Sequence, residues 1–276
     1  MKSHKPNILL IYTGGTIGMV KDFETGALIA FDFNELLSRI PELHLLDCQI
    51  ETYSFEVPID SSNMNVSSWQ KMAKIIEENY SQFDGFVVLH GSDTMSYSAS
   101  ALSFMLENLS KPVIFTGSQL PIGDLRTDAK ENLITAIQVA SLQEKNKPVI
   151  QEVCLYFEYK LYRGNRTTKI SAEHFNAFTS PNFPELAESG VHLKVNNEIG
   201  LKQKRSKKLK VHANFDDNVA ILKIFPGINQ NVLTAFFAIP NLKGIVLETY
   251  GSGNKKKKKW FVQALEDAIH NNIHVI

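Results

Sequence analysis

The sequence contains few cysteines and no excess of charge of either sign. Only two cysteines occur among 276 residues, Cys48 and Cys154, and neither has a second cysteine or a histidine at the spacing of a metal site. Both are expected to be reduced structural thiols, because stable disulfides are rare in the cytoplasm. The 29 basic and 29 acidic residues balance, so overall charge gives no reason to expect nucleic acid or an anionic membrane as a partner.

Long hydrophobic runs are also absent. No stretch approaches the roughly 18 apolar residues that a transmembrane helix requires, and the run at residues 8–12 is too short for the apolar part of a signal peptide. These absences predict a cytoplasmic protein. At the other end, residues 272–276 read as the start of a strand, so we expect the chain to be truncated there.

What the sequence does contain is an alternation of strand and helix patterns. Short apolar runs rich in β-branched residues occur at 8–12, 86–89, 112–115, 153–157, 219–225 and 244–247. Apolar residues at helical spacing occur at 69–80, 133–140 and 260–268. Ser67 with Gln70 is a candidate capping box for the first of these helices. The alternation predicts an α/β fold with a mostly parallel sheet.

A polar stretch interrupts this pattern. Residues 191–212 contain a basic run and no clear periodicity, which is typical of a linker. We therefore expect an N-terminal catalytic α/β domain with a parallel sheet over residues 1–190 and the linker over 191–212. A smaller, incomplete C-terminal α/β domain is expected over 213–276.

Glycine turns that carry hydroxyl groups follow the first two strand patterns. Thr13–Gly18 follows residues 8–12, and His90–Thr94 follows residues 86–89. In parallel sheets, ligands gather at the carboxyl ends of the strands, where glycines let backbone N–H groups approach them. Thr16 is a candidate nucleophile there, although its hydroxyl needs an activator. The alternative role of Thr16 is to cap a turn.

The second turn adds a carboxylate to the hydroxyl. Ser92 and Asp93 occupy successive positions, and a carboxylate at such a site can bind an ammonium group. The alternative role of Asp93 is the N-cap of a helix over residues 96–106. The next strand pattern runs into Thr116–Gln119, again small and hydroxyl-bearing. Three such strand ends together favour a binding or catalytic site.

Two further segments give weaker signals. Lys169 closes the stretch 162–169 and is either a candidate base or an ordinary solvated lysine. Asp60–Met64 is a turn rich in hydroxyl and carboxamide groups. Such a turn can bind a carboxylate or form an ordinary loop.

Taken together, these motifs resemble those of the bacterial cytoplasmic, type I L-asparaginase family. The matching segments are Tyr12–Met19, Asp60–Met64, His90–Met95, Ser100–Asn108, Lys111–Gln119 and Leu161–Lys169. Their order and spacing carry the resemblance over essentially the whole chain. The resemblance implies an N-terminal α/β domain with the catalytic residues and a smaller C-terminal α/β domain.

The resemblance also implies hydrolysis of a small molecule, L-asparagine, to L-aspartate and ammonia without metal or cofactor. The implied catalytic residues are Thr16 as nucleophile, with Ser92, Asp93 and Lys169 as a second hydroxyl–acid–lysine set. The implied substrate-binding residues are Asp60, Ser61, Ser62, Ser92, Asp93 and Ser118. A full-length protein of this kind is expected to be a homodimer or homotetramer.

The chain departs from the family pattern in the lid that follows Met19. The family usually supplies a tyrosine near Glu24–Gly26, whereas Ala27 and Leu28 follow here. Two other functions stay open at this level. One is the amidase-like subunit of a tRNA-dependent amidotransferase, and the other is a non-catalytic amino-acid-binding protein on the same scaffold.

Overall fold

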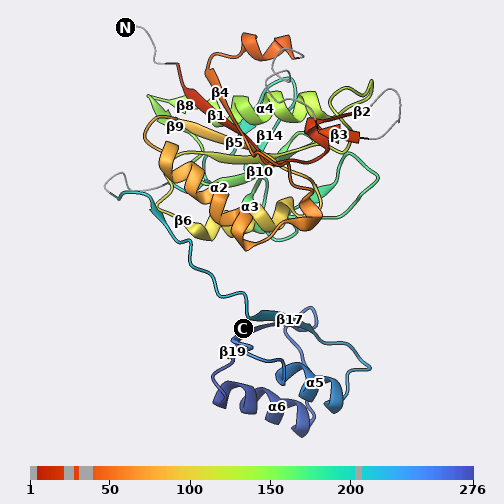
Figure 1. Cartoon of the computed structure of the whole chain (residues 1–276). Coiled ribbons are helices and arrows are strands. Elements are labelled where there is room, and N and C mark those ends of the chain that lie inside the picture. Colours follow the sequence, from red (N-terminus) through yellow and green to blue (C-terminus); the bar gives the residue numbers. More distant parts are fainter. Residues whose placement is uncertain (1–4, 22–27, 31–39, 203–206) are drawn as a thin grey trace. The chain divides into compact units, whose positions relative to one another are not determined.

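The computed structural model describes residues 5–21, 28–30, 40–202 and 207–276. The chain divides into two compact units, unit 1 over Met1–Ala213 and unit 2 over Asn214–Ile276 (Figure 1). Each unit has its own hydrophobic core. The α/β fold expected from the sequence is confirmed.

Unit 1 is built around an eight-stranded sheet in the order β15-β14-β11-β10-β7-β5-β1-β4. Its strands are β1 Asn7–Tyr12, β4 Gln49–Ser54, β5 Gly85–Leu89, β7 Val113–Thr116, β10 Val153–Phe157, β11 Lys160–Arg163, β14 Ala187–Glu188 and β15 Lys194–Val195. The strands from β4 to β10 pair in parallel, whereas β11, β14 and β15 pair antiparallel. Because parallel strands point the same way, the loops after β1, β5 and β7 emerge at one edge of the sheet.

Helices cover both faces of this sheet (Figure 1). The α-helices are α2 Val66–Asn79, α3 Met95–Met105 and α4 Ala129–Ser141, and the 3₁₀ turns are η1 Thr16–Gly18, η2 Pro41–Leu45, η3 Ser61–Asn63 and η4 Gly164–Arg166. Side chains alternate across β1, as the pleat requires. Ile8, Leu10 and Tyr12 pack in the core that contains α4. Leu9 and Ile11 pack in the core that contains α2 and α3.

Short paired strands complete unit 1. They are β2 Met19–Lys21 with β3 Leu28–Ala30, β6 Leu106–Glu107 with β16 Lys210–Val211, β8 Gln143–Glu144 with β9 Lys147–Pro148, and β12 Thr168–Lys169 with β13 Phe178–Thr179. The last pair places Lys169 on a strand rather than in an irregular loop.

Unit 2 is a three-stranded parallel sheet in the order β17-β18-β19, packed against two helices. Its elements are β17 Val219–Lys223, α5 Gln230–Phe237, β18 Gly244–Glu248, α6 Lys259–His270 and β19 His274–Val275. The strand patterns at 219–225 and 244–247 correspond to β17 and β18, and the helix pattern at 260–268 corresponds to α6.

The polar stretch 191–212 carries two short strands. β15 pairs with β14 of the central sheet, and β16 pairs with β6. Just beyond it, the backbone oxygen of Ala213 accepts a hydrogen bond from Gln70 Nε2 at 2.6 Å. Residues 203–206, in the basic run, lie outside the described residues. Lys194–Val195 and Lys210–Val211 are therefore paired with other strands of unit 1, to which the stretch belongs.

The first long helix does not begin with the expected capping box. α2 starts at Val66, and the side chain of Asn65 accepts a hydrogen bond from Ser68 N at 3.0 Å. Ser67 Oγ donates to the same Asn65 oxygen at 2.6 Å. The prediction of a Ser67–Gln70 box is wrong, because the preceding asparagine, a strong N-cap residue, satisfies the free backbone N–H.

Cys48 and Cys154 are both free, as the sequence predicts. Within the described parts of the chain, no helix is long and apolar enough to cross a membrane.

A buried ion pair holds the start of β10 to the end of β11. Arg163 Nε donates to Glu152 Oε2 at 2.6 Å, and the side chains are only 14% and 4% exposed. Arg163 Nη2 also donates to the backbone oxygen of Ile199 at 2.9 Å, and Leu201 N donates to Glu152 Oε1 at 2.7 Å. The pair thus ties residues 199–201 to the central sheet.

Replacing Glu152 by alanine should lower the free energy of unfolding of unit 1 by about 3–5 kcal/mol, because the guanidinium of Arg163 then stays buried without its partner. Urea unfolding followed by circular dichroism measures this loss. The matched control is Glu185→Ala, since Glu185 pairs with Lys160 at 2.9 Å while both side chains are 39–42% exposed. Breaking that pair should cost at most about 1 kcal/mol, and equal losses in the two variants would contradict the prediction.

Candidate active site

Loops from separate parts of unit 1 meet at the carboxyl ends of β1, β5 and β7. The backbone N–H and the side-chain hydroxyl of Thr13 both donate to Leu89 O, at 3.0 and 2.9 Å. The backbone N–H of Ile59 donates to Thr13 O at 2.8 Å, and His90 N donates to Thr116 O at 2.9 Å. These bonds hold together the turns that contain Thr16, Ser61, Ser92 and Ser118.

Glycines allow the Thr16 turn to lie directly against its neighbours. Gly15 has φ +91°, and a Cβ built there would lie 2.5 Å from Gly91 N, in the turn before Ser92. Gly14 has φ +134°, and a Cβ there would lie 2.2 Å from Ile59 O. Both positions combine a backbone conformation and a contact that only glycine tolerates. The half-buried Thr16 is therefore held beside the backbone of the Gly91–Ser92 turn.

The segment before α2 forms the next wall of the site. Ser61 is buried, its backbone oxygen accepts from Thr94 Oγ1 at 2.7 Å, and a Cβ on Gly91 would lie 2.5 Å from Ser61 Oγ. Asp60 and Ser62 are exposed. Asp60 accepts a hydrogen bond from Ser62 N at 3.0 Å, and bonds from the Ser62 backbone and hydroxyl lower the pKa of this carboxyl.

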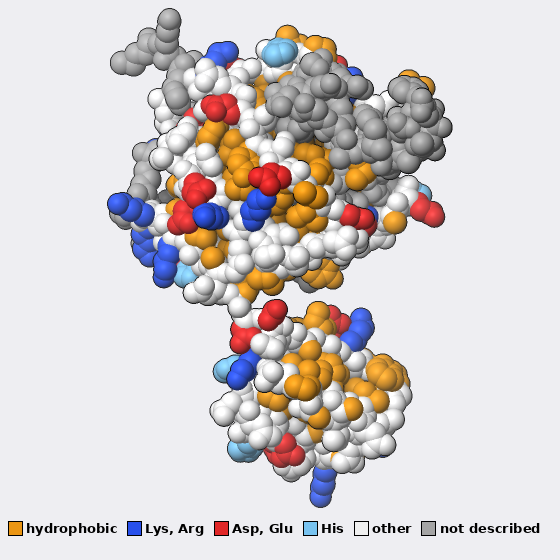
Figure 2. All heavy atoms as spheres, viewed as in Figure 1, with side chains coloured by type: hydrophobic (Ala, Val, Ile, Leu, Met, Phe, Trp, Pro, Cys, Tyr) orange, Lys and Arg blue, Asp and Glu red, His pale blue; other side chains and the backbone are white. Residues whose placement is uncertain are grey.

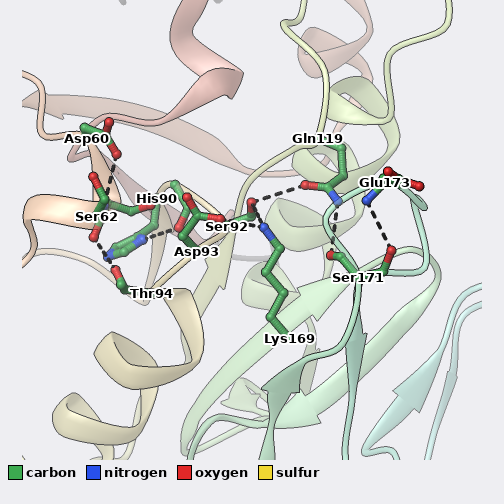
Figure 3. Close-up of polar contacts among 12 residues, drawn as sticks. Asp60, Ser62, His90, Ser92, Asp93, Thr94, Gln119, Lys169, Ser171 and Glu173 are labelled. Carbon is green, nitrogen blue, oxygen red and sulfur yellow. Dashed lines mark hydrogen bonds and ion pairs between the residues drawn. The ribbon is translucent and has the colours of Figure 1, made fainter.

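A lysine from a distant part of the chain joins the Ser92–Asp93 turn (Figure 3). Lys169 Nζ lies 2.8 Å from Ser92 Oγ and 2.7 Å from Asp93 Oδ1. The Lys169 side chain is 16% exposed, whereas that of Asp93 is 63% exposed. The alternative role of Asp93 as a helix cap is not what the structure has, because Thr94 occupies the N-cap position of α3.

The loop after β7 contributes a glutamine that the sequence pattern did not predict. Ser92 Oγ donates to Gln119 Oε1 at 3.2 Å. The buried carboxylate of Asp128 accepts from the backbone of Gln119 at 2.9 Å and of Leu120 at 3.1 Å. Ser118 is buried, and its hydroxyl donates to Leu120 O at 2.6 Å. In the sequence, the hydroxyl groups of Thr116–Gln119 marked this segment as a candidate part of the site. In the structure, the group that bonds to Ser92 is the side-chain amide of Gln119.

Electrostatics at the site reflect burial. Burial raises the pKa of Asp128, and hydrogen bonds from Gln119 and Leu120 oppose that shift. Burial also raises the pKa of Tyr12 to about 12, so its phenol stays protonated at neutral pH. The Tyr12 hydroxyl donates to Gly18 O at 3.2 Å. Tyr12 therefore supports the η1 turn. It begins the matching segment Tyr12–Met19, whereas Asp128 lies outside every matching segment.

A cleft of about 630 Å³ opens on the lysine side of the site. Asp93 and Lys169 border it, together with hydroxyl-bearing residues of α3 and of the segment 167–171. Among the described residues, no group of three or more His, Cys, Asp or Glu side chains is arranged to hold a metal ion. The lid position near Glu24–Gly26 lies outside the described residues.

The structure thus brings Thr16, Ser61, Ser92, Asp93 and Lys169 into one region by three routes, whereas the Ser118 hydroxyl is bonded to Leu120 O and Asp60 and Ser62 are exposed. Gly15 and Gly91 join the Thr16 turn to the Ser92–Asp93 turn. Ser61 contacts Gly91, and Lys169 contacts Ser92 and Asp93. A hydroxyl that is a candidate nucleophile, a carboxylate and a lysine thereby lie in one region at the edge of a parallel sheet, which suits acyl transfer on a small polar compound.

Comparison with known proteins relates this geometry to a family. The sequence model described as "Asparaginase, N-terminal" matches residues 7–200. The one described as "Glutaminase/Asparaginase C-terminal domain" matches residues 218–276. These matches fall on either side of the boundary between units 1 and 2.

Individual relatives agree with the family match. L-asparaginase 1 of Escherichia coli K12 is 42% identical over 273 residues, which cover 99% of this chain and 79% of the relative. The crystal structure of L-asparaginase I from Vibrio cholerae has a TM-score of 0.89 at 37% identity, and the match covers 98% of this chain and 80% of that one. One component of the glutamyl-tRNA(Gln) amidotransferase of Thermococcus kodakarensis is 34% identical, over 99% of this chain and 62% of the relative.

Proposed function

This chain belongs to the asparaginase family, and we propose that it hydrolyses L-asparagine to L-aspartate and ammonia. One observation carries the proposal beyond family membership. The Thr16 turn packs on the Gly91–Ser92 turn, while Lys169 lies within 2.8 Å of both Ser92 and Asp93 side chains. A candidate nucleophile and a charged hydrogen-bonding set therefore share one site.

The charges of the site suit an amino-acid zwitterion. Asp93 uses Oδ1 for Lys169, which leaves Oδ2 to accept from the α-ammonium group. Ser61 and Ser62 begin the η3 turn and supply hydroxyl and backbone donors for the α-carboxylate. Asp60 and Ser118 complete the binding set. With both ends of the substrate bound, its side-chain amide is directed toward Thr16, and such orientation is a large part of enzymatic rate enhancement.

The reaction proceeds through a threonyl ester. Thr16 Oγ attacks the side-chain amide carbon and forms a C–O bond, and the C–N bond breaks. The hydroxyl proton goes to the departing nitrogen, so that ammonia leaves. A water molecule then attacks the ester carbon, and the proton that it loses restores the Thr16 hydroxyl. Ser92, Asp93 and Lys169, joined by hydrogen bonds, are the groups that transfer protons in these two steps.

The proposal also covers the location, the partner and the oligomeric state of the protein. We infer that the protein is cytoplasmic, in keeping with its two free cysteines, and that a small molecule rather than nucleic acid is its partner. A homodimer or homotetramer has support in unit 2, where hydrophobic side chains gather on the face seen in Figure 2. Val219, Ile221 and Val246 are all more than 40% exposed, and extensive exposed apolar surface is typical of interaction sites.

Ammonia release by this chain tests the proposal. We expect L-asparagine to give ammonia and L-aspartate in equal amounts, with L-glutamine assayed in parallel and Thr16→Ala protein as the background. Saturable binding of L-asparagine without ammonia would replace the proposal by the non-catalytic amino-acid-binding function. Ammonia release that requires a misacylated tRNA would replace it by the amidotransferase function.

A further inference from the structure

A network of buried polar side chains lies beneath the Ser92–Asp93 turn and plays no part in the chemistry above. His90 and Ser98 are fully buried, and Trp69 is half-buried. Trp69 Nε1 lies 2.9 Å from Ser98 Oγ, Ser98 Oγ lies 2.8 Å from His90 Nε2, and His90 Nδ1 lies 2.7 Å from Gly91 O. We call this the Trp69–Ser98–His90 network; it joins α2, α3 and the end of β5.

The two ends of the network fix the direction of every hydrogen bond in it. The indole N–H of Trp69 can only donate, and the carbonyl oxygen of Gly91 can only accept. His90 must therefore carry a proton on Nδ1 to bond to Gly91 O. Burial lowers the pKa of His90 to about 4, so the ring is neutral near pH 7 and its Nε2 is an acceptor. Ser98 consequently accepts from Trp69 and donates to His90.

Gly91, at the end of this network, contacts two walls of the site. A Cβ built on Gly15 would lie 2.5 Å from Gly91 N and 2.6 Å from Gly91 Cα. A Cβ built on Gly91 would lie 2.5 Å from Ser61 Oγ. The next residue along the chain is Ser92. Neither glycine leaves room for a Cβ, so the backbone of Gly91 lies directly against the Thr16 and Ser61 turns. The orientation of the Gly91–Ser92 peptide therefore affects how the Thr16, Ser61 and Ser92 turns fit together.

We propose that His90 is a positioning residue, which in its Nδ1–H tautomer holds the Gly91–Ser92 peptide in register with the Thr16 and Ser61 turns, and that Ser98 and Trp69 select this tautomer. The proposal rests on the proposed function for its effect on turnover. It assigns no contact with substrate to His90. Its consequence is that a single N–H on a buried ring controls the relative placement of nucleophile and binding groups.

Two substitutions separate the two ring nitrogens. In His90→Asn the side-chain amide can place an N–H near the position of Nδ1, so the bond to Gly91 O is kept and the one to Ser98 is lost. In His90→Gln the longer amide reaches toward Ser98 and leaves Gly91 O without a donor. We expect His90→Asn to keep kcat/KM for L-asparagine within about tenfold of the wild type. His90→Gln should lose about 10²-fold, the order expected for misplaced reacting groups, mainly in kcat.

The tautomer gives a readout that does not depend on folding stability or on turnover. Long-range ¹H–¹⁵N correlation spectra should show His90 with the proton on Nδ1 in the wild type. Trp69→Phe frees the Ser98 oxygen to accept from Nε2–H, so this variant should populate the Nε2–H form and lower kcat. Ser98→Ala leaves no acceptor at Nε2, so His90 should keep its proton on Nδ1 and kcat should stay closer to the wild type. A wild-type ring protonated on Nε2, or equal losses in His90→Asn and His90→Gln at equal melting temperature, would overturn the proposal.

The outcomes also separate this proposal from the proposed function. If wild-type protein releases no ammonia, the proposed function fails, while the tautomer and the affinity for L-aspartate, measured by calorimetry, still test the role of His90. Weaker L-aspartate binding in His90→Gln than in His90→Asn supports positioning of the site by His90. Identical affinities in both variants and the wild type contradict it.

Discussion

Replacing Thr16 by alanine should lower the turnover of L-asparagine by at least about 10³-fold, which corresponds to about 4 kcal/mol of transition-state stabilisation. The expected loss is large because alanine removes the atom that forms the ester, and with it the covalent route. Ammonia release at saturating L-asparagine measures the effect on kcat. The backbone around the site should be unaffected, since the η1 turn is set by Gly14 and Gly15.

Matched measurements decide whether a loss is chemical. Thr16→Ser keeps the hydroxyl and should retain far more activity than Thr16→Ala. Both variants should unfold at the same urea concentration as the wild type and bind L-aspartate with similar affinity. A folded Thr16→Ala protein with nearly normal turnover would exclude Thr16 as the nucleophile.

Strands of the central sheet could be predicted because they are apolar on both faces. β1, β5, β7 and β10 have buried side chains along almost their whole length, so each reads as a short continuous apolar run. β4 could not be predicted in this way, because most of its residues are exposed and its sequence lacks such a run. α5 has only eight residues, too few for a clear helical period.

The location of the site could also be predicted, but not its internal contacts. Parallel strands end at the same edge of a sheet, which is why Thr16 and Asp93 could be selected as candidates. The pairing of β1 with β5, which brings their turns together, is known only from the structure. The residue pattern alone could not place Lys169 beside Ser92, because 77 positions separate them and the contact depends on how the chain returns after β11. Only the family resemblance grouped the two residues. Gln119 and His90 lie in segments that the sequence marks, but their partners are set by tertiary packing, so the sequence assigned no role to either residue.

Ser92→Ala is the second substitution for which we expect a large loss of turnover, because the Ser92 hydroxyl bonds to two side chains. It donates to Gln119 Oε1 at 3.2 Å and accepts from Lys169 Nζ at 2.8 Å. Ser92→Ala removes both bonds and leaves Lys169 with Asp93 alone. Because positioned proton-transfer groups contribute roughly 10²–10⁴-fold to enzymatic rates, we expect kcat for L-asparagine to fall by at least about 10²-fold in Ser92→Ala.

Ser92→Thr is the control that isolates the hydroxyl. Threonine keeps the Oγ and adds one methyl group at a half-buried position. We expect this variant to stay within about tenfold of the wild-type kcat/KM, which is the lower end of the effect of a methyl-sized change, about 1–3 kcal/mol. The comparison of the alanine and threonine variants uses ammonia release under one set of conditions, with thermal melting to verify folding. Equal activity in the two variants would mean that the Ser92 hydroxyl does not contribute to catalysis. The bonds to Lys169 and Gln119 would then only stabilise the turn, and proton transfer would have to be assigned to other groups around Thr16.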